Sequence, residues 1–96
     1  MKRQNTATLG NVISLWIEEM KLQGKISETR LIGSWGKIVG SYIASKTREI
    51  YIKDRKLVVR IDSSVVRNEL AHAKTMLIGR LNDEGGGDII DDILLW

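Results

Sequence analysis

Six basic side chains lie within fifteen residues of this sequence, close to a tyrosine. They are Lys46, Arg48, Lys53, Arg55, Lys56 and Arg60. Binding of a nucleic-acid backbone needs several such charges on one surface, and binding of a single strand adds aromatic rings on which bases stack. Tyr51 lies among these bases, so the segment is a candidate nucleic-acid surface. Arg67 and Lys74, further along the chain, are candidates to extend it.

The distribution of charge favours a polyanionic partner but leaves alternatives open. Residues 1–80 hold all 15 Lys and Arg against 7 Asp and Glu, a balance of +8, whereas residues 81–96 hold 5 acids and no base. A basic body attracts nucleic acid, and an acidic end either repels that partner or mimics it. The same basic face would also suit docking on an acidic protein, or it is an ordinary solvated surface.

Residues that could support catalysis or metal binding are sparse. The chain has no cysteine and one histidine, His72, with no second ligand at metal-binding spacing. Ser63 and Ser64 have no evident base to activate a nucleophile, and a helix cap explains both. Asp88, Asp91 and Asp92 are of the type that binds a hard cation, but we interpret the last two as protection of an apolar edge strand. We therefore expect no enzyme, no cofactor and no small-molecule substrate.

Two glycine motifs resemble phosphate-binding loops, and we interpret both as structural. Gly33-Ser34-Trp35-Gly36 matches the GxxG of RNA-binding KH loops, but it falls within a helical pattern with its tryptophan at a core position. The run 85–87 has acidic neighbours that would repel an anion, and a strand pattern follows it instead of a helix. We therefore expect packing in the first case and a loop in the second.

Hydrophobic periodicity supplies the elements that would position these residues. A helical pattern covers residues 9–20, with Gly24 just past its end, and a second begins at Ser27. Residues 48–61 alternate with period two and predict a hairpin turning at Asp54-Arg55, with Tyr51 opposite Val58 on the face away from the core. A long helix capped by Ser63 or Ser64 follows, and 89–96 reads as a third strand. The structural core candidates are Trp16, Trp35, Gly40, Leu57, Val59, Leu70 and Leu77.

These elements predict an α+β two-layer sandwich in the order helix-helix-strand-strand-helix-strand, with a three-stranded sheet. We expect a single domain over residues 1–96, with an ordered core of about 9–95. No apolar run follows the basic start and none approaches the length of a membrane span, so we expect a cytoplasmic protein without a membrane partner.

Several motifs in order resemble the bacterial DciA family. They are W-G-K-I-V-G ending at Gly40, then Thr47, the strand K-L-V-V-R-I-D-S-S, N-E-L ending at Leu70, and L-I-G-R-L-N ending at Asn82. The similarity spans roughly residues 9–95. The sequence departs from the family after the Ser-Ser pair. Family members often have a tryptophan two or three residues after that pair, where this chain has Val65, Val66 and Arg67.

This resemblance implies a KH-like domain that binds DNA and contacts the replicative helicase, assisting its loading without catalysis. Single- or double-stranded DNA of low sequence specificity is the expected partner, with the helicase as a second. The alternative is a protein adaptor that docks its basic hairpin face on an acidic partner without touching DNA. The family's longer members carry an extension, so helicase contact need not follow for a chain without one.

Overall fold

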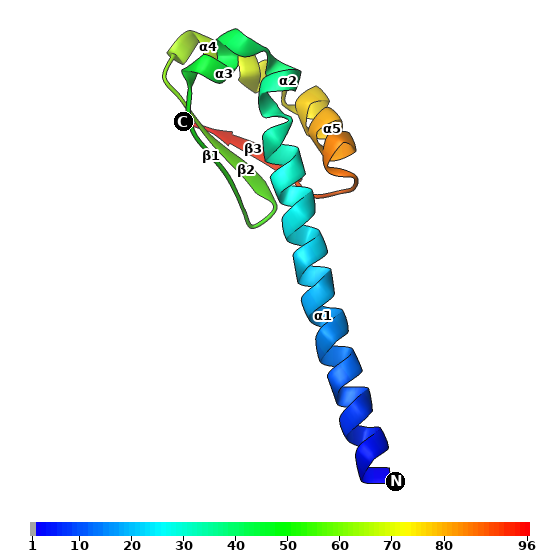
Figure 1. Ribbon diagram of the computed structural model, residues 1–96. Coiled ribbons are helices and arrows are strands. Elements are labelled where there is room, and N and C mark those ends of the chain that lie inside the picture. The colour runs from blue at the N-terminus through cyan, green and yellow to red at the C-terminus, as the bar shows by residue number, and fades with distance from the viewer. Residues whose placement is uncertain (1) are drawn as a thin grey trace.

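A three-stranded sheet covered on one face by helices forms the body of the molecule, and the N-terminal helix extends far from it (Figure 1). The computed structural model describes residues 2–96, with side chains from Leu9 onward. The elements in order are α1 (Lys2–Gly33), α2 (Trp35–Val39), α3 (Ser41–Lys46), β1 (Thr47–Lys53), β2 (Lys56–Ile61), α4 (Ser64–His72), α5 (Lys74–Gly85) and β3 (Asp92–Leu95). The predicted α+β class with a three-stranded sheet is confirmed.

The sheet has β2 at its centre, paired antiparallel with β1 and parallel with β3. The hairpin register follows the period-two pattern, with Tyr51 opposite Val58 and Lys53 opposite Lys56, as predicted. Asp54 and Arg55 both adopt positive φ, 52° and 63°, which is the backbone of the two-residue turn that matches strand twist. Asp tolerates this conformation better than Arg does, so Arg55 carries local strain.

The core lies between the inner face of the sheet and the helices. Its buried residues are Leu31, Trp35, Leu57, Val59, Ile61, Val66, Leu70, Leu77, Leu81, Ile90 and Ile93. Gly40, which we expected in this core, is exposed instead. It ends α2 with φ 93° and ψ 164°, a backbone that glycine adopts without strain, and so redirects the chain into α3.

The N-terminal part of α1 contradicts the expected core. Trp16 is 61% exposed. The helix α1 does not end at Gly24 but continues to Gly33, so residues 9–26 stay outside the body, where all of their side chains are exposed. A single glycine costs a helix only about 1 kcal/mol, and the chain has no proline to break it. Ser27, the expected second start, lies within this helix and is the first side chain of the described part that is half-buried. The body therefore begins near residue 27.

The long third helix of the sequence prediction is also interrupted. Ser63 caps α4 by accepting a hydrogen bond from the Val66 amide at 3.3 Å, as one of the two expected caps. At Ala73, with φ −109° and ψ 11°, the helical path breaks, and α5 begins with Lys74. Leu70 and Leu77, on either side of the break, are both buried in the core.

The packing of α5 against α1 yields a first stability prediction, at Gly85. A Cβ there would overlap Ile89 Cδ1, and would lie 3.2 Å from Leu31 Cβ and 3.3 Å from the Ser27 carbonyl oxygen. We expect Gly85→Ala to lower the free energy of unfolding by about 1–2 kcal/mol, measured by urea denaturation, because the Ile89 side chain would have to move and the two helices would have to separate.

Gly79 in the same helix is the matched control for that substitution. A Cβ at Gly79 has no atom within 4 Å. Gly79→Ala should therefore stabilise the protein by up to about 1 kcal/mol through helix propensity. Equal effects of the two substitutions would contradict the close approach of α1 and α5.

Candidate nucleic-acid interface

The outer face of the sheet, which we call the open face, carries apolar and aromatic side chains in its middle. Tyr51 of β1, Val58 of β2 and Leu94 of β3 occupy one row across the three strands. Tyr51 is 40% and Leu94 42% exposed, so no helix covers this row. A flat surface with an exposed ring is the type of surface on which unpaired bases stack.

Basic side chains flank that row on both sides. Toward the hairpin turn, Lys53 lies opposite Lys56. On the other side, Arg60 places its guanidinium 5.2 Å from the centre of the Trp96 ring. The Trp96 ring reaches this position because its amide donates to the Val59 carbonyl at 3.0 Å and its carbonyl accepts from the Ile61 amide at 2.7 Å. The open face thus combines two exposed rings with three basic residues.

The acidic C-terminal segment neutralises part of the basic cluster. Arg55 contacts the carboxylates of Asp88 and Asp91 at 3.2 and 3.5 Å, and its guanidinium also donates to the Asp88 carbonyl. Lys56 pairs with Asp91 at 3.3 Å and Lys74 with Asp92 at 3.8 Å. Exposed pairs of this kind contribute little to stability, because water screens both charges. Arg55, Lys56 and Lys74 are therefore less available to phosphates than their sequence suggests.

One of these contacts alters an ionisation equilibrium. The hydrogen bond from the Lys56 ammonium, more than its charge or that of Arg55, lowers the pKa of the Asp91 carboxyl. Because the pKa is depressed in the folded state, the stabilisation is present at neutral pH and is lost as the pH falls through that lowered value. Asp91 therefore remains an ionised partner of Lys56 throughout the neutral range.

Three further candidates lie outside the open face. Arg48 occupies the irregularity in the β1 register and contacts Asp62 at 3.0 Å. Arg67 donates to the Ile61 carbonyl at 2.6 Å, and Lys46, at the end of α3, lies over the Tyr42 ring at 5.7 Å. The structure therefore brings together Tyr51, Lys53, Lys56 and Arg60 on the open face and leaves Lys46, Arg48 and Arg67 outside it. Arg55 lies in the turn beside Lys56, and Lys74 belongs to α5, where it pairs with Asp92.

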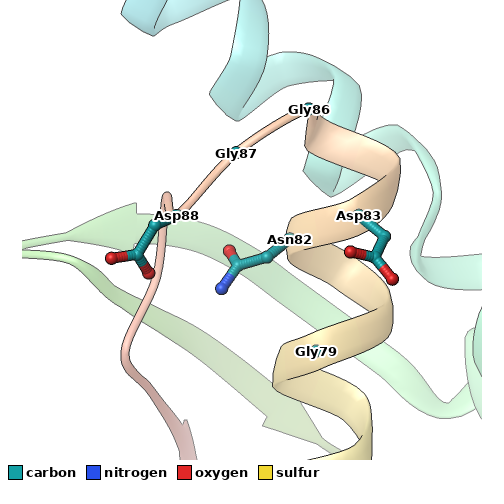
Figure 2. Close-up of a pocket in the computed structure, with 6 residues that line it drawn as sticks. All are labelled: Gly79, Asn82, Asp83, Gly86, Gly87 and Asp88. Carbon is teal, nitrogen blue, oxygen red and sulfur yellow. The ribbon is translucent and has the colours of Figure 1, made fainter.

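The glycine-rich loop after α5 lines a shallow pocket that is poorly suited to phosphate (Figure 2). Asp83 and Asp88 line it, and the amides of Gly86 and Gly87 already donate to the Asn82 carbonyl at 2.9 and 3.1 Å. The Asn82 side chain accepts from the amides of Ile89 and Ile90 and donates to the Ile90 carbonyl. These contacts hold the loop in shape, a role that sequence reasoning missed.

The GxxG segment lies between α1 and α2 instead of within one helix, which corrects the expected location. Its two central residues, Ser34 and Trp35, are 7% and 4% exposed. The Ser34 amide donates to carbonyls of α1, and its hydroxyl donates to the Leu31 carbonyl at 2.7 Å. Side chains and amides engaged in this way cannot clamp a phosphate, so the motif is structural in this fold.

Two other kinds of feature, a metal site and a membrane span, are absent from the described residues. Within the described residues, 2–96, no group of three His, Cys, Asp or Glu side chains is arranged to hold a metal ion. None of the helices of that range combines the length and apolar character that a membrane span requires.

The fold and the open face together define an α+β domain with a candidate binding surface on its uncovered sheet. The model of one protein family, described as "Dna[CI] antecedent, DciA", matches residues 8–95. The chain belongs to the DciA family.

A curated relative agrees with this assignment. The chain is 26% identical over 89 residues to a "UPF0232 protein" of Corynebacterium glutamicum (strain R). The alignment covers 93% of this chain and 50% of the relative, so the chain spans about half the length of the curated relative it matches. No solved structure gives a significant match.

Proposed function

We propose that the open face binds single-stranded DNA and that the chain acts, without catalysis, in loading of the replicative helicase. The observation that carries the proposal is the pair of exposed rings, Tyr51 and Trp96, among basic side chains on one uncovered sheet face. The rings would stack on bases, and Lys53 and Arg60 would contact phosphates. Stacking of this kind requires unpaired bases, which favours a single strand over a duplex.

The helicase part of the proposal rests on family membership alone.

Within the described residues, neither Lys53 nor Arg60 makes an ion pair with an acidic side chain. Neither charge is held in an ion pair, although Glu49 lies opposite Arg60 in the register of β1 and β2, and this supports DNA binding in the absence of the helicase.

The first test is fluorescence anisotropy of a labelled single-stranded oligonucleotide at several salt concentrations, without any partner protein. For about two to four neutralised phosphates, log affinity should fall with log salt at a slope of about −1.4 to −2.8. A folded protein that fails to bind at low salt would rule out the DNA-binding proposal.

The second candidate function is docking of the open face on an acidic protein. The exposed Leu94 favours it, because apolar side chains at the centre of a charged face are typical of protein interfaces. Binding to purified replicative helicase, measured with DNA absent and after failure of the anisotropy test, would support this alternative over the first.

A further inference from the structure

The projecting part of α1 carries an apolar stripe that the body does not cover. Its members are Leu9, Val12, Ile13, Trp16, Ile17 and Met20, each 45% exposed or more. In a helix these positions lie on one face, since they follow the spacing i, i+3, i+4, i+7, i+8 and i+11. Figure 1 shows this part of α1 extending away from the sheet and the other helices. An apolar stripe of this length is a typical interaction surface.

The spacing of the stripe is symmetric about its own midpoint. Counted from the centre between Ser14 and Leu15, Leu9 mirrors Met20, Val12 mirrors Ile17 and Ile13 mirrors Trp16. Two copies of such a helix, related by a two-fold axis and antiparallel, therefore place every apolar side chain opposite another apolar side chain. A two-fold interface uses the same patch on both subunits, and this patch is self-complementary.

The length of the projecting helix fits the same arrangement. With the axis at that midpoint, Lys2 of one copy reaches the level of Ser27 of the other, which is where the body begins. The two helices would overlap along their projecting parts without the bodies colliding. Within residues 9–20 the charged residues are Glu18 and Glu19, which would lie opposite Asn11 and Gly10, so no like charges meet.

The area available suits a weak but specific dimer. Each copy would contribute six large apolar side chains, each 45% exposed or more, to the interface. A single helix pair of this length stays at or below about 1,200 Å² of buried surface, the lower end of the range for stable interfaces. We propose that α1 pairs with α1 of a second copy of this chain as an antiparallel two-fold dimer. The dimer would place two sheet faces at the two ends of the paired helices.

The oligomeric state tests the proposal directly, by sedimentation velocity over a range of concentrations. The expected species is a dimer of twice 10.8 kDa that dissociates in the micromolar range. Trp16→Glu should raise the dissociation constant about 30-fold or more, since it buries a charge at the centre of the interface. The far-UV circular dichroism of the body should be retained, because Trp16 lies outside the core.

Leu15 provides the matched control. It is 67% exposed against 61% for Trp16, but it lies on another side of the helix, outside the stripe. Leu15→Glu should change the dissociation constant less than about threefold. A protein that is monomeric at all concentrations would overturn the proposal, and so would a dimer that resists Trp16→Glu or responds equally to Leu15→Glu.

Disulfide trapping tests the antiparallel orientation, because the chain has no cysteine of its own. On oxidation of a mixture of Leu9→Cys and Met20→Cys chains, the mixed disulfide should form in preference to either homodimer, as judged by mass spectrometry. Efficient crosslinking of Leu9→Cys alone would indicate parallel pairing and overturn the proposed arrangement. A monomer whose α1 stripe is protected only by purified helicase would assign the surface to that partner and overturn the dimer.

Discussion

Trp35→Ala is expected to lower the free energy of unfolding by about 3–5 kcal/mol. The indole is 4% exposed between α2 and the sheet, and its Nε1–H donates to the Thr47 hydroxyl at 3.0 Å. The same hydroxyl donates to the Ile43 carbonyl at 2.9 Å, which links α2, α3 and the start of β1. A small domain has a stability of only about 5–15 kcal/mol, so this loss threatens folding. Urea denaturation followed by circular dichroism measures it.

Trp16 is the control for the same chemical change. We expect Trp16→Ala to alter the free energy of unfolding by less than about 0.5 kcal/mol at concentrations where the chain is monomeric, because the ring is exposed. Thr47→Val keeps the size of the side chain but removes the acceptor of the indole N–H, and should cost about 1–3 kcal/mol. A Trp35→Ala protein as stable as the parent would contradict the placement of this ring in the core.

Tyr51→Ala is expected to weaken binding of single-stranded DNA by about 1–3 kcal/mol, which corresponds to about 5- to 150-fold in affinity. Tyr51 lies in the central row of the open face, between the Lys53 side and the Arg60 side of that surface. Loss of the ring removes a stacking platform but no charge. The salt dependence of binding should therefore stay unchanged while affinity falls, as measured by anisotropy at two salt concentrations.

Tyr42→Ala is the matched control for the open face. Tyr42 is 65% exposed and also has a basic neighbour, Lys46, but it belongs to α3 and not to the sheet. Its substitution should change affinity less than about threefold if the open face is the binding surface. A larger effect of Tyr42→Ala than of Tyr51→Ala would move the binding surface to the α3 end of the molecule.

The hairpin shows which structure local sequence could predict. Alternation of period two assigns Tyr51 and Val58 to one face and Ile52 and Leu57 to the other, because side chains of a strand point to opposite sides in turn. The register follows from a two-residue turn, even though Asp54 and Arg55 lack the glycine that such a turn favours. The centre of the candidate site, Tyr51 with Lys53, Lys56 and Arg60, was therefore predictable.

The two tryptophans of the helical region show where that reasoning stops. Trp16 and Trp35 both occupy the apolar face of a helical pattern, yet one is exposed and the other buried. Periodicity identifies the apolar face of a helix but carries no information about what covers it. The body, with its sheet of three short strands, is large enough to cover only the last part of α1. The burial of Trp16 or Trp35 therefore depends on the size of the body and not on the helical pattern.

Sequence reasoning also could not tell which members of the basic cluster are paired with acidic side chains. Its neutralising partners are distant in sequence, with Arg55 and Lys56 held by Asp88 and Asp91 more than thirty residues later. The parallel pairing of β3 with β2 is what brings the acidic segment beside the hairpin turn. Composition and periodicity thus sufficed for the fold class, the hairpin register and the placement of Tyr51, Lys53, Lys56 and Arg60 on one sheet face, because these depend on local spacing. Burial of α1 and the pairing of charges depend on contacts between distant segments, which only the folded chain brings together.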